Sequence, residues 1–208
     1  MSIFIHESAE VHPSAKIGDG TKIWNNVQIR ENAIIGTNCN LGKGVFIDAK
    51  VKIGNSVKIQ NFVSIYYGVE VEDEVFIGPN ATFTNDLYPR STSPDWEIFP
   101  TKLEFGCSIG ANSTVVCGVT IGMYSMIGAG AIVTNSVLPH ALMIGNPARL
   151  SGFVCKKGHP MKQTDFLKDK LILECSECKQ KISFLVKFLL RPFLPNYYIQ
   201  GLYLFRQK

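Results

Sequence analysis

The sequence predicts an all-β fold of the parallel solenoid type, in which short strands and corners alternate along the chain. A large apolar residue recurs at every sixth position from Val11 to Phe83. Small or β-branched residues recur with the same period from Ala15 to Ala81, four positions after each large residue. An α-helix would repeat at about 3.6 residues and a simple strand at every second residue, so neither explains this pattern.

Each six-residue unit is expected to form one strand and one corner, and three units would close a triangular coil. The large residues would then fill the coil interior, and the small ones would lie where the walls converge. Because glycine adopts backbone conformations that other residues resist, we expect corners at the glycines that directly follow a large residue. These are Gly18, Gly36, Gly42, Gly54 and Gly78.

The repeat is interrupted once. After Phe83 the next large residue in phase is Leu103, twenty residues further on, which is not a multiple of six. We therefore predict that a loop of residues 84–101 leaves the coil and returns, and its prolines and polar residues suit such an excursion. Long loops on rigid scaffolds often carry function, and a purely decorative insertion is the alternative.

The repeat ends near residues 144–149, and the composition changes beyond it. Three parts are therefore predicted. Residues 1–150 form the solenoid domain, residues 151–180 a small appendage, and residues 181–208 an apolar tail.

Composition limits the compartment and the partners. The formal net charge of +4 is modest, and no dense Lys/Arg run predicts a nucleic-acid groove, although a mildly basic surface suits anionic ligands such as nucleotides or coenzyme A. Residues 1–6 lack the features of a secretory signal, and no run of about 18 apolar residues predicts a membrane-spanning helix. The six cysteines are then expected as reduced thiols or metal ligands, which favours a cytoplasmic protein.

Five segments are more specific than the repeat. They are residues 59–69 (IQNFVSIYYGV), 78–86 (GPNATFTND), 89–91 (PRS), 116–122 (VCGVTIG) and 141–149 (ALMIGNPAR). Over about residues 1–155, the chain resembles the bacterial nucleotide-sugar 3-N-acetyltransferases of the hexapeptide-repeat group. The segment from Phe83 to Arg90 carries most of this specificity, because the repeat alone occurs in proteins of many functions.

The resemblance implies a left-handed β-helix, because periodicity alone does not fix the handedness. It also implies a homotrimer with active sites between neighbouring subunits and acetyl-CoA as the co-substrate. Enzymes of this family acetylate the 3-amino group of UDP-2-acetamido-3-amino-2,3-dideoxyglucuronate or of dTDP-linked 3-amino-3,6-dideoxyhexoses. Both products serve the synthesis of surface polysaccharides such as lipopolysaccharide.

The positions of the histidines favour an amine as the acceptor. The four histidines are His6, His12, His140 and His159, and none lies between Pro13 and Pro139. Related O-acetyltransferases use a coil histidine as a base, because an alcohol needs one in the transition state and a neutral amine does not. The same absence argues against a three-histidine zinc site of the γ-carbonic anhydrase type. A sugar O-acetyltransferase with Asp86 as base, or a non-catalytic solenoid for assembly, are the alternatives.

The resemblance suggests that Asn85 contacts the sugar amine and orients it beside the thioester. Asp86 would bind the ammonium or relay its proton through water, or it would cap the loop. The planar fork of Arg90 suits a diphosphate or a sugar carboxylate. The other candidates for binding the nucleotide and sugar are Gln60, Asn61, Tyr66 and Tyr67.

Coenzyme A is expected along the coils after the insertion, where small residues would leave room for the pantetheine arm. The candidates there are Gly110, Ala111, Gly128 and Ala129, with Arg149 for a CoA phosphate. For each of these residues an ordinary corner or surface role is the alternative. We expect direct attack of the amine on the thioester without a covalent enzyme intermediate, and holding the two reactants in line can contribute ~7–11 kcal/mol.

Two close pairs of soft ligands predict a closed tetrahedral zinc site in the appendage. The pairs are Cys155 with His159, and Cys175 with Cys178. Related enzymes carry a Cys-x-Cys pair in the first half, and here Lys157 stands in place of the second cysteine. Reduced cysteines in a small β-hairpin are therefore the alternative to structural zinc.

The tail is rich in apolar and aromatic residues between Lys181 and Lys208. Packing against the solenoid or a neighbouring subunit is favoured, and contact with a membrane surface is the alternative.

Overall fold

The computed structural model describes residues 2–92 and 97–185. The chain divides into two compact units, Met1–Gly158 and His159–Lys208. Both units are built from β-strands, and the described residues contain no helix. Among these residues, therefore, no helix is present that could cross a membrane.

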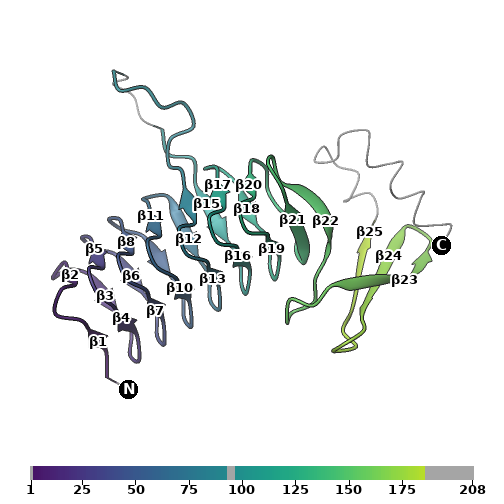
Figure 1. Ribbon diagram of the computed structural model, residues 1–208, viewed down its shortest axis with the longest axis horizontal. Helices are drawn as coiled ribbons and strands as arrows, with labels where there is room; N and C mark the ends of the chain where they lie inside the picture. The colour runs from purple at the N-terminus through teal and green to yellow at the C-terminus, as the bar shows by residue number, and fades with distance from the viewer. Residues whose placement is uncertain (1, 93–96, 186–208) are drawn as a thin grey trace. The chain divides into compact units, whose positions relative to one another are not determined.

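The first unit is a parallel β-helix with three flat faces, which we call sheets A, B and C (Figure 1). Sheet A contains β1 (Phe4–Ile5), β4 (Lys22–Ile23), β7 (Asn40–Leu41), β10 (Lys58–Ile59), β13 (Phe76–Ile77), β16 (Ser108–Ile109), β19 (Met126–Ile127), β21 (Ala141–Ile144) and β22 (Arg149–Phe153). Sheet B contains β2 (Glu10–Val11), β5 (Gln28–Ile29), β8 (Phe46–Ile47), β11 (Ser64–Ile65), β14 (Thr82–Phe83), β17 (Thr114–Val115) and β20 (Ile132–Val133). Sheet C contains β3 (Lys16–Ile17), β6 (Ile34–Ile35), β9 (Lys52–Ile53), β12 (Val69–Val71), β15 (Thr101–Leu103) and β18 (Thr120–Ile121).

The register confirms that three six-residue units close one coil. Lys22 pairs with Asn40, and Asn40 pairs with Lys58, in parallel. Strands of one sheet therefore belong to successive coils, and the chain is a left-handed parallel β-helix. We name each corner by the sheets that it joins, so that the B–C corner follows a strand of sheet B.

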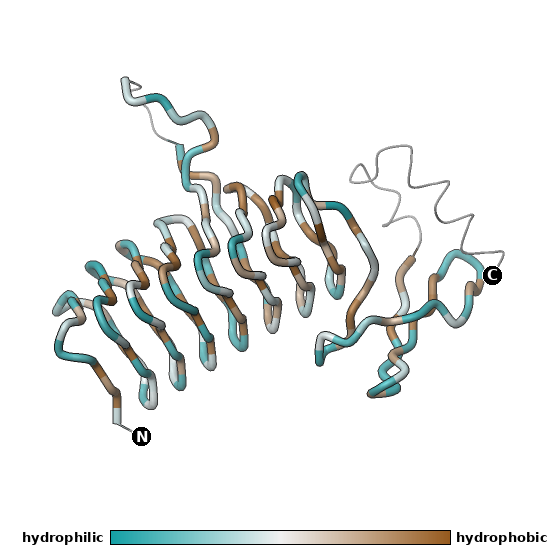
Figure 2. The backbone as a smooth tube through the Cα atoms, in the orientation of Figure 1, coloured by the Kyte–Doolittle hydropathy of each residue, from teal (hydrophilic) through white to brown (hydrophobic). Residues whose placement is uncertain are grey.

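The interior of the β-helix consists of the two predicted series. The large residues from Ile23 to Val133 are buried, and so are small ones such as Val27, Val63 and Ala131. Apolar and polar residues consequently alternate around each coil (Figure 2). The first coil differs, because Ile5 has no coil beyond it and its side chain is 46% exposed.

The glycines predicted at the corners are required by the close approach of successive coils and not by an unusual φ. A Cβ on Gly18 would lie 2.5 Å from the carbonyl carbon of Gly36, and one on Gly36 would lie 2.5 Å from the oxygen of Gly54. Positive φ occurs two residues later in the corner, as at Gly20 (74°) and Asn38 (56°). The conformational expectation was therefore wrong, and close stacking of successive coils explains these glycines.

The repeat is interrupted at one B–C corner, between β14 and β15. Residues 84–92 and 97–100 extend from the β-helix there, and Thr101, which the sequence had placed in the loop, is the first residue of β15 (Figure 1). The coils on either side stack directly, because Val69 pairs with Thr101 and Phe83 pairs with Val115. The insertion therefore leaves the stacking of the helix intact.

After a parallel bridge between Ile121 and Val137, the parallel stacking ends at β21, which pairs in parallel with β19 and antiparallel with β22. The domain limits drawn from the sequence stay predictions, and the first compact unit extends to Gly158.

The second unit contains a three-stranded antiparallel sheet in the order β23 (Met161–Leu167), β24 (Lys170–Cys175) and β25 (Lys181–Leu185). Its described buried side chains are Leu171, Leu173 and Cys175. The predicted tail begins in β25, and its remaining residues 186–208 lie outside the described part of the chain.

Candidate active site

Two predicted catalytic residues lie at the start of the insertion. Asn85 and Asp86 come directly after β14 and Thr84, and both side chains are half-buried. The Oδ1 atom of Asp86 accepts a hydrogen bond of 2.8 Å from the N–H of Tyr88. This is the loop-capping contact that was one of the two roles considered for Asp86, and it fixes the direction of the carboxylate.

Hydrogen bonds to the next coil hold both ends of the insertion. The N–H of Cys117 donates to Oγ1 of Thr84 at 2.9 Å, and the N–H of Gly118 donates to the oxygen of Phe99 at 3.1 Å. The N–H of Gly118 also lies 3.1 Å from Oγ1 of Thr101. The backbone around Asn85 is thus attached to a rigid coil rather than free in a loop.

Tyr66 and Tyr67 lie on the same edge of the β-helix, one coil earlier, because Ser64 pairs with Thr82. The N–H of Tyr67 donates to Oδ2 of Asp48 at 3.1 Å, and the ammonium of Lys50 lies 5.9 Å from the centre of the Tyr67 ring. Asp48 is itself held by Arg30, whose Nη1 lies 3.0 Å from Oδ1 of Asp48.

The corner that contains these tyrosines also seats the far end of the insertion. The N–H of Thr101 donates to the oxygen of Gly68 at 2.9 Å. A Cβ on Gly68 would lie 2.6 Å from Cγ2 of Ile98, and Gly68 has a φ of +94°. Only glycine therefore fits at this position.

Arg90 is an exposed residue of the insertion, and its Nη1 donates to the oxygen of Pro89 at 2.7 Å. Seven residues were predicted to bind or transform the sugar. Five of them gather here: four lie on the B–C edge, and Arg90 lies further along the insertion. The four on the edge are Tyr66, Tyr67, Asn85 and Asp86.

Gln60 and Asn61 lie on a different edge, at the A–B corner after β10. The Oδ1 atom of Asn61 accepts a hydrogen bond of 2.9 Å from the N–H of Lys43, which is a corner contact between coils. Sheet B separates these two residues from the B–C edge within one chain.

The residues predicted to bind coenzyme A share the A–B edge with Gln60: Gly110, Ala111, Gly128 and Ala129. A Cβ on Gly110 would lie 2.5 Å from the nitrogen of Ala129, so coil stacking already accounts for this glycine. This is the corner role that the sequence left open as the alternative for Gly110, and coenzyme A binding at this edge stays a prediction. Arg149 lies in β22, and its Nη1 donates to the oxygen of Ala148 at 3.0 Å.

The histidines of the first unit make structural contacts away from the insertion. Nδ1 of His6 and Nδ1 of His12 each lie 2.9 Å from a serine Oγ two residues later. Nδ1 of His140 lies 2.8 Å from the oxygen of Val154, and its ring stacks on Tyr124 at 5.3 Å. Burial, with a further contribution from the Lys156 ammonium, lowers the pKa of His140 against the opposing effect of the Val154 contact.

Cys39 and Cys107 lie in the core, where burial raises the pKa of both thiols, that of Cys107 to about 12. Neither is thus suited to act as a nucleophile at neutral pH.

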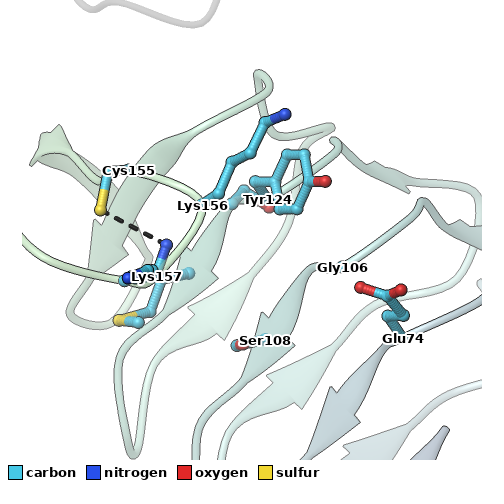
Figure 3. Close-up of a pocket in the computed structure, with 10 residues that line it drawn as sticks. Glu74, Gly106, Ser108, Tyr124, Cys155, Lys156 and Lys157 are labelled. Carbon is cyan, nitrogen blue, oxygen red and sulfur yellow. Dashed lines mark hydrogen bonds between the residues drawn. The ribbon is translucent and has the colours of Figure 1, made fainter. Parts of the chain in front are cut away.

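A cavity of about 240 Å³ lies on sheet A, away from the B–C edge (Figure 3). It is lined by Glu74, Ser108 and Tyr124, and by the turn from Cys155 to Gly158. The N–H of Lys157 donates to Sγ of Cys155 at 3.3 Å, which is the contact drawn in Figure 3. None of the predicted sugar-binding residues lines this cavity.

The predicted metal ligands are grouped. Sγ of Cys175 lies 3.9 Å from Nδ1 of His159, and Cys178 donates its N–H to the same sulfur at 3.5 Å. Cys155 precedes His159 by four residues, and one ligand atom from each of the four residues lies within 4.8 Å of the others. The Cys178 hydrogen bond is the main cause of a lowered pKa of the Cys175 thiol, which favours the thiolate that a metal needs.

No role was predicted for Asp48, Thr84 and Thr101. Their side chains accept hydrogen bonds from backbone N–H groups of neighbouring coils and so hold the B–C edge in place. The repeat gives no signal for Asp48, because the charged residues Arg30, Glu72 and Glu104 also directly follow a large residue of the repeat.

Comparison with known families decides the classification. The profile described as bacterial transferase hexapeptide, six repeats, matches residues 4–49, 50–85 and 100–135, which together exceed half of the chain. The chain belongs to this family. The gap in the match, residues 86–99, coincides with the insertion after β14.

Individual relatives match over shorter stretches. A dTDP-3-amino-3,6-dideoxy-α-D-galactopyranose 3-N-acetyltransferase of Aneurinibacillus thermoaerophilus is 43% identical over 77 residues, which are 37% of this chain and 38% of the relative. The galactoside O-acetyltransferase of Escherichia coli is 35% identical over 88 residues, which are 40% of this chain and 43% of the relative. Both matches therefore span less than half the length of the relative.

Among solved structures, a hexapeptide transferase family protein of Anaplasma phagocytophilum is similar with a TM-score of 0.52 and 18% identity. The similarity covers 72% of this chain and 81% of that protein, and it supports the β-helical fold alone.

Proposed function

We propose that this hexapeptide-family protein transfers acetyl from acetyl-CoA to the 3-amino group of a nucleotide-linked amino sugar. The observation that carries the proposal is the arrangement of Asn85 on the B–C edge, at a loop end held by Thr84, beside Tyr67 of the preceding coil. The identity of 43% to a dTDP-sugar 3-N-acetyltransferase supports the same acceptor. The two acceptors under consideration are UDP-2-acetamido-3-amino-2,3-dideoxyglucuronate and a dTDP-3-amino-3,6-dideoxyhexose.

The proposed reaction needs no residue that becomes acetylated. The neutral amine attacks the thioester carbonyl, a C–N bond forms, the C–S bond breaks, and coenzyme A leaves as its thiolate. The proton lost by the amine balances that charge and yields the free thiol. The amide of Asn85 holds the amine in line, while the carboxylate of Asp86, directed by the Tyr88 N–H, stabilises the ammonium before it loses its proton.

The proposed site also accounts for the division of residues between two edges. Gln60 and the residues around Gly110 lie on the A–B edge, and sheet B separates them from Asn85 in one chain. A site that uses both edges needs two neighbouring copies, so we include a homotrimer in the proposal. Molar mass from light scattering tests this part, and a monomer would contradict it.

The test of function is the release of coenzyme A thiol with a panel of nucleotide-linked sugars. Each 3-amino sugar is paired with its 3-hydroxy analogue, and we expect turnover with amines. No thiol release with any amine would contradict the proposal. Turnover with hydroxyl sugars alone would support the O-acetyltransferase alternative, to which the galactoside O-acetyltransferase match also points.

Asn85→Ala tests the residue assignment. We expect kcat to fall by about 10²–10³, as when one positioned donor is removed from an active site. Asn135→Ala is the matched control, because Asn135 occupies the B–C edge after β20, where no insertion follows. Equal activity of the Asn85 variant and the control would remove Asn85 from the mechanism.

We also propose a structural zinc ion. Zinc bonds of about 2.3 Å to sulfur and about 2.0–2.1 Å to nitrogen place tetrahedral sulfur and nitrogen ligands about 3.6 Å apart, which is close to the 3.9 Å between Cys175 Sγ and His159 Nδ1. Three thiolates and one imidazole suit zinc, and four protein ligands leave no position for a substrate. Such an ion would staple the small second unit and take no part in acetyl transfer.

The products of this reaction would serve the synthesis of surface polysaccharide, and we place the enzyme in the cytoplasm, where acetyl-CoA and nucleotide sugars are available. Fractionation of cells with an antibody to the native chain tests the location.

A further inference from the structure

Outside the insertion, the corners of the B–C edge carry lysine and arginine only on the N-terminal side of Asn85. The corner at residues 48–50 lies two coils before Asn85, because β8, β11 and β14 are consecutive strands of sheet B. The corners after β17 and β20, at residues 116–118 and 134–136, contain no charged residue. A polyanionic ligand with one end at Asn85 would therefore extend along this edge toward the N-terminal coils.

The two cations of these corners, Arg30 and Lys50, differ in their partners. Nη2 of Arg30 lies 2.8 Å from Oε1 of Glu31, and its Nη1 lies 3.0 Å from Oδ1 of Asp48. Lys50 is exposed, its ammonium lies 5.9 Å from the centre of the Tyr67 ring, and no carboxylate of the described residues pairs with it. Lys50 is therefore the corner cation that can take an anionic partner.

The backbone on both sides of the contact between Lys50 and Tyr67 is held in place. The N–H of Lys50 donates to the oxygen of Glu31 at 3.0 Å, and the N–H of Tyr67 donates to Oδ2 of Asp48 at 3.1 Å. Each residue is thus attached to the preceding coil. A side chain that starts from a fixed point loses less conformational freedom when it binds a ligand.

The spacing between Lys50 and Asn85 suits one part of the proposed acceptor. Neighbouring strands of a sheet are about 4.8 Å apart, so two coils separate the two corners by roughly 10 Å along the helix. In a nucleotide-linked 3-amino sugar, the pyranose ring and the glycosidic oxygen lie between the amino nitrogen and the diphosphate. An amine beside Asn85 would thus place the diphosphate within reach of the Lys50 ammonium, with Tyr67 on the coil between them.

We propose that Lys50 binds the diphosphate of the nucleotide-linked acceptor, and that the nucleotide extends from Asn85 toward the N-terminal coils. We take the amine to lie beside Asn85, so this assignment rests on the proposed function. An ammonium suits the role because it is a compact charge with three N–H donors. The carboxylates of Glu31 and Asp48 already pair with Arg30, which reduces their repulsion of the phosphates.

Binding of UDP and dTDP to the full-length protein, measured by calorimetry, tests the assignment without turnover. We expect Lys50→Ala to weaken binding of both nucleotides at least about tenfold, because hydrogen bonds between charged groups are the stronger ones. Lys50→Arg keeps the cation and should bind within about threefold of the parent. Lys22→Ala removes an exposed lysine from sheet A, the face opposite the B–C edge, and is the matched control.

Steady-state kinetics with the nucleotide-linked 3-amino sugar gives a second readout. The contact with the diphosphate is made equally in the ground state and in the transition state. Lys50→Ala should therefore raise KM for the sugar at least about tenfold and leave kcat within about twofold of the parent. KM for acetyl-CoA should not change.

Several results would overturn the assignment of Lys50. They are failure of the parent to bind either nucleotide, equal affinity of the parent and Lys50→Ala, and equal weakening by Lys22→Ala, which net charge would explain. Equal weakening by Lys50→Arg and Lys50→Ala would also overturn it, because the charge would then not matter. The proposed function stands through any of these results if the parent releases thiol with 3-amino sugars. Nucleotide binding that depends on Lys50, without thiol release from any amine, would uphold the assignment and reject the function.

Discussion

The β-helix and the second unit reach a folded state by different means. In the β-helix the large residues from Ile23 to Val133 are no more than 3% exposed, and each coil covers the next. The described part of the second unit buries Leu171, Leu173 and Cys175 in a sheet of three strands. Repetition thus extends a core for as long as the pattern lasts, whereas the three described strands of the second unit bury few apolar side chains, which is why we propose that a zinc ion stabilises them.

Removal of the proposed zinc ion is expected to have the largest effect, and on the second unit only. Structural zinc in small domains contributes an apparent ~10–16 kcal/mol, so Cys175→Ser or a strong chelator should abolish protection of the β23–β25 amides against hydrogen exchange. The amides of the β-helix should keep their protection. Cys39→Ser changes a core thiol of the β-helix and is the control. Full protection of β23–β25 in the metal-free protein would show that the sheet needs no staple.

The comparison predicts that the β-helix is weakest at its open end. Ile59 is completely buried in a middle coil, while Ile5 is 46% exposed in the first. Ile59→Ala should lower the free energy of unfolding by about 2–5 kcal/mol, and Ile5→Ala by roughly 1 kcal/mol or less. Denaturant unfolding measures both. Equal losses would mean that the end of the helix is covered in solution.

Ser125 is an exception within the β-helix core. Its hydroxyl is buried and, among the described residues, lacks a hydrogen-bond partner. Ser113 lies in the same inward series, and its Oγ donates to the oxygen of Gly110 at 2.7 Å. Ser125→Ala should therefore stabilise the protein by about 1 kcal/mol, and Ser113→Ala should destabilise it by a similar amount. Destabilisation in both variants would indicate that Ser125 has a partner in solution, such as a buried water molecule.

The smallest effect concerns His140 at the last C–A corner. Its folded pKa lies below the ordinary 6.5. As the pH falls below about 6.5, His140 takes up a proton in the unfolded chain before it does so in the folded chain. The free energy of unfolding therefore decreases as the pH falls from about 6.5 to the folded pKa, and below that pKa it decreases no further on this account. His140→Asn keeps a residue that tolerates the φ of 61° and should lose less stability than the parent between pH 7.5 and 5. Identical pH profiles would show that His140 does not contribute.

The β-helix could be predicted almost completely because its signal is periodic and local. Each step of six from Val11 to Phe83 tests the same hypothesis again, and the jump to Leu103 locates the insertion. The reason for the glycines could not be predicted, because the close approach of Gly18 to Gly36 joins residues eighteen positions apart and depends on how tightly coils stack. The register that fixes this distance is a property of the assembled helix.

The candidate site could be predicted only in part. Asn85 and Asp86 were found from a motif that resembles a known family, and their place beside the insertion follows from the repeat. The separation of Gln60 from Asn85 depends on which of three corners each residue occupies, and counting in sixes reveals this once the sheets are assigned. The contact of Asp48 with the N–H of Tyr67 could not be found in this way, because it joins a side chain to the backbone of another coil.

The way in which the insertion is attached has a consequence for how such proteins diversify. Its two ends are held by neighbouring coils that stack as if nothing lay between them, with Val69 against Thr101 and Phe83 against Val115. The entropy of closing a loop grows only with the logarithm of its length. A peptide of quite different length and composition can therefore occupy this corner at little cost to the scaffold. Acceptor preference can then change during evolution, or by loop grafting in the laboratory, while the β-helix stays the same.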